Sequence, residues 1–186
     1  MLKKLALLTV LLAVPAMFAQ GTDAKHEFVG AKTCGMCHHT EKQGNQLSIW
    51  EGSAHAKAYE TLKTAEADKI AKEKGFSTKA VETEACLKCH VSGHGVDASL
   101  LGKKFKVEDG VQCETCHGAG GDYKNLKVMK DEKLAEQNGL KFYKTAEARE
   151  ALCKECHNSN SPTFDAKKAN FTEMWAKIKH EIPSGK

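Results

Sequence analysis

Apolar residues recur at helical spacing only over short stretches of this chain, and a capping side chain, a glycine or a proline bounds each stretch. Thr64 and Glu66 are typical of a helix N-terminus, and Gly75 is typical of the residue that follows a helix. A helix is therefore predicted over residues 65–74.

Three further helices and one extended segment are predicted on the same grounds. The helices are residues 125–138 before Gly139, a helix begun by Thr145 that carries residues 153–157, and residues 165–181 between Pro162 and Pro183. Residues 100–112 are expected to contain a short extended segment. The pattern as a whole predicts one mainly α domain with short helices and irregular loops.

The N-terminus has the pattern of a secretory signal peptide. Lys3 and Lys4 precede an apolar run over residues 5–18, and the small residue Ala19 follows it. The run is shorter than the roughly 17–25 residues of a membrane-spanning helix, and Pro15 interrupts it. We therefore predict a signal peptide over residues 1–19, a domain over residues 20–186 that is exported to the periplasm, and no stable membrane insertion.

The charge balance indicates little about partners. Lys and Arg number 28 against 24 acidic residues, a net charge of +4. Nucleic-acid recognition depends strongly on arginine, and Arg149 is the sole arginine in the sequence. We therefore expect no nucleic-acid partner. The unusual feature of the composition is a count of eight Cys and nine His.

All eight cysteines fall in four copies of C-x-x-C-H, which is the attachment signal for c-type haem. Residues i and i+3 of a helical turn share a face, so both thiols can form thioethers with one porphyrin and the next histidine can ligate its iron. The motif residues are Cys34, Cys37 and His38; Cys86, Cys89 and His90; Cys113, Cys116 and His117; and Cys153, Cys156 and His157.

We therefore predict four covalently bound c-type haems, with the four motif histidines as proximal iron ligands. Only 6% of the residues are aromatic, so the haems are expected to form much of the core of a multihaem cytochrome c fold whose loops wrap around them.

Other uses of paired cysteines fit this sequence less well. Zinc sites built from C-x-x-C pairs do not require a histidine after every pair. A thioredoxin-like C-x-x-C is a single motif beside a βαβ pattern, which is not present in the sequence. Four disulfides in an exported chain would not explain the repeated spacing.

Five histidines remain as candidates for the distal position on the iron atoms: His26, His39, His55, His94 and His180. His55 lies among small residues, His180 lies in the last predicted helix, and His94 lies between two glycines. These three are the stronger candidates, and His26 stays open. His39 directly follows a proximal histidine and cannot reach the far side of the same iron. Bis-histidine ligation would give lower reduction potentials than histidine with methionine, and Met36 and Met129 are the alternatives.

The chain resembles small exported tetrahaem cytochromes c of the cytochrome c-554 family. The likeness rests on residues 28–34, residues 50–56 around His55, residues 110–118, and residues 178–180 before Pro183. It implies a mostly helical fold with closely packed haem pairs, periplasmic electron carriage, and His55 and His180 as distal ligands. Many relatives carry G-x-G-x-x-H after the third motif, whereas this chain has Tyr123 at the histidine position. The corresponding iron must then find another ligand or remain five-coordinate.

The predicted function is electron transfer between respiratory redox partners, which would bind transiently through small interfaces. Irons with two histidine ligands have no open position for a substrate, so no catalytic residue is assigned. Two alternatives stay open. One is a haem reductase of nitrogen oxides that uses a five-coordinate haem, and the other is a subunit of a conductive filament or of a respiratory complex.

Overall fold

The computed structural model describes residues 26–183, so the predicted signal peptide lies outside the described residues. The α-helices of this part are α1 (Ala31–Gly35), α2 (Gln46–Glu51), α3 (Ala58–Thr61), α4 (Ala65–Glu73), α5 (Glu84–His90), α6 (Cys113–His117), α7 (Leu126–Met129), α8 (Glu132–Gln137), α9 (Ala146–Lys154) and α10 (Phe171–Ile178). The 3₁₀ turns are η1 (Glu41–Gln43), η2 (Ala80–Glu82), η3 (Ala98–Leu100) and η4 (Val107–Asp109).

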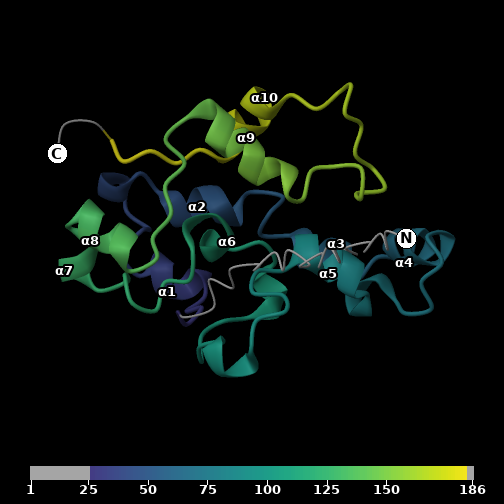
Figure 1. The fold of residues 1–186 in the computed structure, drawn as a ribbon, viewed down its shortest axis with the longest axis horizontal. Helices are drawn as coiled ribbons and strands as arrows, with labels where there is room; N and C mark the ends of the chain where they lie inside the picture. The colour runs from purple at the N-terminus through teal and green to yellow at the C-terminus, as the bar shows by residue number, and fades with distance from the viewer. Residues whose placement is uncertain (1–25, 184–186) are drawn as a thin grey trace, which may run out of the picture.

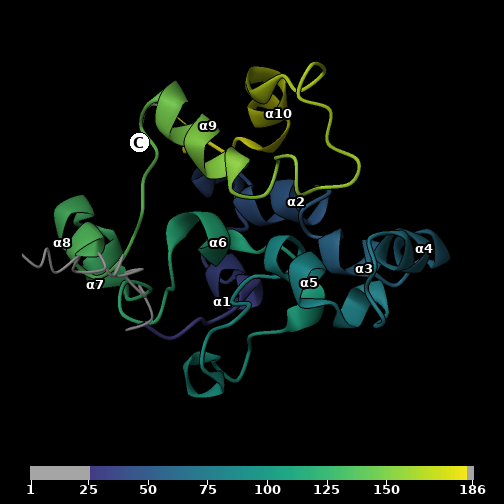
Figure 2. The same ribbon diagram turned by 45° about the vertical axis from the view of Figure 1, so that its right-hand side comes forward.

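The helices are arranged around a centre formed by α1 and α6, which lie against each other in both views (Figures 1 and 2). The pair α7 and α8 lies at one end of the molecule, and α4 lies at the other. The last two long helices, α9 and α10, pack together on one side of this central region. The elements that carry the cysteine motifs therefore surround the middle of the fold.

The prediction of a mainly α fold is confirmed. Within residues 26–183 the single β contact is an isolated parallel bridge between Phe28 and Leu101, so the extended segment predicted over residues 100–112 is reduced to this bridge. Part of that segment forms η4 instead. None of the described helices has the length and apolar character needed to cross a membrane.

Two helices begin where the sequence predicts. Thr64 caps α4 by accepting the N–H of Ala67 through its side chain, and Gly75 follows the helix with φ of +86°. Thr145 caps α9 in the same way by accepting the N–H of Ala148. The predicted extent of α9 was too long, because the helix ends at Lys154 and the last residues of the fourth motif form a turn.

The prediction of one helix over residues 125–138 is wrong, because α7 and α8 are separate helices. Asp131 lies between them in an extended conformation, and its carboxylate accepts the N–H of Leu134. This capping bond starts a new helix in place of the continuing one.

The last helix, α10, is also shorter than the predicted range of residues 165–181. Asn170 is extended and caps the helix by accepting the N–H of Glu173, while Lys179 is extended and ends it. Local capping side chains therefore decided where these helices begin.

The buried apolar residues form two small clusters rather than one large core. The first joins Leu62, Ala71 and Ala80 beneath α4, and the second joins Tyr123, Ala135 and Leu140 beneath α7 and α8. The largest side chains that are fully buried are polar, namely Gln112 and Glu114. Both flank the first cysteine of the third motif, at the centre of the molecule.

Candidate functional site

Each C-x-x-C-H motif occupies a helical turn, so its two cysteines and its histidine are neighbours in space. In the first motif the N–H of His38 donates to the carbonyl oxygen of Cys34 at 3.1 Å, and in the fourth the N–H of His157 donates to that of Cys153 at 2.8 Å. The second motif lies at the end of α5, and the third makes up the whole of α6. This local geometry suits two thioether bonds and one iron ligand for each porphyrin.

The four motifs contact one another through their cysteines. The thiol of Cys34 hydrogen-bonds to Cys113, and this bond is the largest cause of the raised pKa of Cys34. The thiol of Cys156 bonds in the same way to Cys89. Cys116 lies close enough to Cys153 for an electrostatic interaction. The motifs therefore lie in the spatial order first, third, fourth, second, which differs from their order in the sequence.

Two pairs of histidine rings meet across the fold. The rings of His55 and His157 have centroids 6.2 Å apart, and those of His117 and His180 have centroids 5.9 Å apart. Two metal–nitrogen bonds of about 2.0 Å, added to the ring radii, place the centroids of two axial imidazoles about 6 Å apart. Each pair joins a predicted proximal histidine to a predicted distal one, so the residues present fit a bis-histidine haem iron.

Several of these histidines have the Nδ1 atom held by a backbone carbonyl. The Nδ1 atom of His90 donates to the carbonyl oxygen of Ala58 at 2.8 Å. In the same way, Nδ1 of His117 donates to Lys141 at 3.2 Å, and Nδ1 of His180 donates to Ile178 at 2.8 Å. The Nδ1 atom of His38 bonds to the side chain of Gln46. Holding Nδ1 in this way orients the ring and leaves Nε2 for a metal.

Gln46 and these carbonyls are the functional groups that sequence reasoning missed. Backbone carbonyls carry no sequence signal, and Gln46 has no special spacing from the first motif.

The remaining candidate histidines are bound differently. Nδ1 of His26 lies 2.5 Å from Asp122 Oδ2, which leaves its Nε2 atom unengaged by that contact. In His94 the Nε2 atom itself bonds to Glu84, at 3.1 Å. His39 is exposed and its Nδ1 atom bonds to the carbonyl of Gly35. Within residues 26–183, the structure brings none of these three rings into contact with another histidine ring.

Tyr123 is buried, and its hydroxyl donates to the carbonyl of Gly118 at 2.7 Å. Burial raises the pKa of this hydroxyl, so the group stays protonated. The side chain packs with Ala135 and Leu140 in the second apolar cluster. In this structure Tyr123 is a packing residue.

Burial also shifts the ionisation of the site. It lowers the pKa of His55, His117 and His157, which favours the neutral imidazole whose nitrogen lone pair can bind a metal. It raises the pKa of the Cys116 thiol to about 11 and that of Cys156 to about 12. A nucleophilic C-x-x-C thiol needs a lowered pKa instead.

The zinc alternative finds no support in the arrangement of side chains. Within residues 26–183, no group of three or more Cys, His, Asp or Glu side chains is placed to hold a bare metal ion. The motif cysteines meet in pairs across motifs instead of converging in fours.

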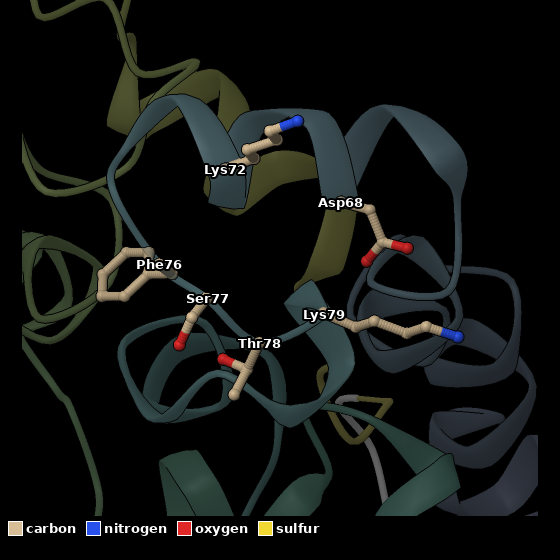
Figure 3. A pocket seen from close by; sticks show the side chains of 6 residues that line it. All are labelled: Asp68, Lys72, Phe76, Ser77, Thr78 and Lys79. Carbon is tan, nitrogen blue, oxygen red and sulfur yellow. The ribbon is translucent and has the colours of Figure 1, made fainter.

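The cavities of the described surface include one beside the fourth motif and one beside α4. One of about 510 Å³ is lined by His157 together with Phe164 and Phe171, which gives the fourth motif an apolar wall on the loop before α10. That volume is in the range of ordinary cofactor sites, about 300–1,000 Å³. The other, of about 310 Å³, lies between α4 and the segment after it. Figure 3 shows that Asp68, Lys72, Phe76 and their neighbours line it, with no cysteine or histidine among them.

Comparison with known proteins gives one family and one relative. Residues 33–118, which span the first three motifs, match the family model described as cytochrome c554 and c-prime. The chain is 31% identical over 171 residues to cytochrome c-554 of Nitrosomonas europaea, an alignment that covers 86% of this chain and 70% of that protein. No solved structure gives a significant match.

Proposed function

Because the chain belongs to the cytochrome c-554 family, we propose that it transfers electrons through four covalently bound c-type haems, one on each C-x-x-C-H motif. Family membership already indicates a haem protein of electron transport. The number of haems, their ligands and the cellular compartment are the parts proposed here. Haem supplies a one-electron Fe(III)/Fe(II) couple, and the polypeptide supplies its attachment, its axial ligands and the spacing between sites.

The observation that carries this proposal is the contact between motifs. Cys34 meets Cys113, Cys116 lies beside Cys153, and Cys156 meets Cys89. Electron tunnelling falls steeply with distance, so sites that are attached to neighbouring cysteines form an efficient relay. The proposed route therefore follows the order first, third, fourth, second motif, or its reverse.

The ring contacts support two of the proposed pairs of axial ligands. His38, His90, His117 and His157 serve as proximal ligands of their own motifs. His55 serves as the distal ligand opposite His157, and His180 serves opposite His117. His26 and His94 remain the candidates for the first and second motifs. His26 bonds to Asp122 through Nδ1, so this contact leaves its Nε2 atom available. His94 bonds to Glu84 through Nε2, so its ring would have to move before that atom could bind iron.

A reductase of nitrogen oxides is the second candidate function, and one observation favours it. Nε2 of His94 is bonded to Glu84, which lies on the same helix as the second motif, and the hydroxyl of Tyr123 donates a hydrogen bond to Gly118. An iron held by His90 or His38 can therefore remain five-coordinate, with a position open to a small ligand. A fully low-spin ferric spectrum would argue against this function.

The proposed site of action is the periplasm, after removal of residues 1–19. Haem attachment to C-x-x-C-H motifs suits an exported protein, because covalent bonds retain a cofactor that could otherwise be lost. The partners would be redox proteins that bind through small, short-lived contacts.

The test is to express the whole chain with the haem-attachment machinery and to measure the mass of the exported protein. We expect the mass of the polypeptide without its signal peptide plus four haems, sharp c-type bands on reduction, and colour that survives acid-acetone extraction. A matched control with both cysteines of one motif changed to alanine should carry three haems. An exported chain of unmodified mass, or one with its cysteines bridged to each other, would overturn the proposal.

A further inference from the structure

A buried carboxylate joins the first motif to the third. Glu114 lies between the two cysteines of the third motif and is 2% exposed. Its Oε1 atom accepts the N–H of Val29 at 2.8 Å and that of Gly120 at 2.7 Å, and its Oε2 atom accepts the N–H of Gly30 at 2.8 Å. The carboxyl oxygens accept all three bonds. Burial raises the pKa of Glu114, and the three backbone N–H donors oppose that rise.

Gln112 adds a second connection on the other side of Cys113. Its Oε1 atom accepts the N–H of Ala31 at 2.8 Å, and its Nε2 atom donates to the carbonyl of Lys106 at 2.8 Å. The amides of three consecutive residues, 29–31, are therefore held by two side chains that flank Cys113. These amides lead into α1 and lie three to five residues before Cys34.

The arrangement leaves little freedom between the two motifs. Three of these bonds join a side chain next to Cys113 to a backbone amide three to five residues before Cys34. A buried N–H that loses its acceptor finds no water to replace it, so breaking any of these bonds is costly. A shift of α1 relative to α6 would therefore break several bonds at once.

The other motifs have no such side chain. The corresponding positions hold Leu87 and Lys88 in the second motif and Lys154 and Glu155 in the fourth. Glu155 is exposed, and Lys154 forms an ion pair within its own helix with Glu150. Two glutamates, Glu114 and Glu155, lie between paired cysteines. Of these two, Glu114 is the one that is buried and bonded to residues before the first motif.

We propose that Glu114 is a positioning residue that fixes the first motif against the third and so sets the electronic coupling between the two haems they hold. This inference rests on the proposed function, since it assumes haem at both motifs. The carboxyl group bonds to none of the proposed iron ligands, and it acts through the backbone amides that lead into α1.

The test compares Glu114→Gln with the wild-type holoprotein by electron paramagnetic resonance of the ferric state. In the wild type we expect a signal broadened by interaction between the neighbouring irons of the first and third motifs. In the variant, one of the three N–H donors would face the amide NH₂ group of glutamine, so the motifs shift and that interaction changes or is lost. Glu155→Gln is the matched control, because it makes the same chemical change at an exposed glutamate inside the fourth motif.

A purely stabilising role predicts another result. The melting temperature of Glu114→Gln would fall, but the coupled signal of the protein that is folded would match the wild type, and this outcome would overturn the proposal. A wild-type protein with four haems and no coupled signal would overturn it as well. A wild type that lacks haem would instead refute the proposed function.

A second variant covers the case in which Glu114→Gln does not accumulate. In Gly120→Ala the added Cβ would lie 3.2 Å from Glu114 Oε1 and 3.1 Å from Val29 Cγ2, so the carboxylate must move by a few tenths of an ångström while its charge is kept. We expect a smaller change in the same signal, at full haem content. An unchanged signal in Gly120→Ala, with four haems attached, would also overturn the proposal.

Discussion

Two junctions of this molecule are built from different groups. At the junction of α1 with α6, Glu114 and Gln112 bind backbone amides directly. At the boundary between residues 145–183 and residues 26–140, the described chain has no hydrogen bond or ion pair apart from the thiol contact of Cys156 with Cys89. The groups that meet there include motif cysteines, histidine rings and the backbone of Gly44 against that of Glu181.

The histidine pairs cross this boundary in both directions. His55 comes from the first range and meets His157, whereas His180 comes from the second range and meets His117. Within the second range, α9 and α10 hold each other through Arg149 over the ring of Trp175 and Lys154 over the ring of Phe171. The difference indicates that the polypeptide closes the first junction by itself, whereas ligation of haem iron would close the second.

The largest effect that separates the junctions is expected from removal of the fourth attachment site. In Cys153→Ala/Cys156→Ala we expect three haems and release of residues 145–183. Proteolysis in the linker before α9 should then be about tenfold faster, which corresponds to a loss of about 1.4 kcal/mol of docking free energy. The measurement is limited proteolysis of the holoprotein, with the fragments identified by mass.

The control for this experiment is Cys34→Ala/Cys37→Ala, which also removes one haem. Its linker should be cleaved at nearly the wild-type rate, because the first motif is held by Glu114 and Gln112. Equal acceleration in both double variants would remove the proposed distinction between the junctions.

A smaller effect is expected from loss of one crossing ligand. His55→Ala and His180→Ala should each convert one haem from low spin to high spin while all four haems stay attached, because the thioether bonds do not depend on the distal histidine. The ferric optical and paramagnetic spectra report the change. His39→Ala is the control, since His39 is exposed and bonds to Gly35. If the spectrum of His55→Ala equals that of the control, His55 is not a ligand.

The most local effect, the loss of one hydrogen bond with no change in haem content, is expected at the polar junction. Gln112→Ala leaves the N–H of Ala31 buried without its acceptor, which costs about 1–3 kcal/mol of unfolding free energy. Denaturant unfolding of the holoprotein measures this loss. Gln137→Ala, an exposed change at the end of α8, should stay within about 0.5 kcal/mol of wild type. A Gln112→Ala protein as stable as that control would show that this bond adds nothing to the junction.

Much of the fold was predictable from local sequence. Thr64 and Thr145 cap α4 and α9 where their patterns predict, because an N-cap depends on residues within one turn of it. The single helix predicted over residues 125–138 failed because the apolar stripe was continuous while Asp131 provided a cap in its middle. The start of α10 was misplaced for a similar reason, since Asn170 and not Pro162 sets it.

Composition and spacing alone determined the chemistry of this protein. Four C-x-x-C-H motifs predict which atoms can hold haem, because attachment needs only groups within one helical turn. Which motifs are neighbours, which histidines face each other, and that Glu114 is buried between two motifs were decided by the tertiary structure. These relations join residues that are from 37 to 102 positions apart in the chain, and no local pattern encodes such a distance.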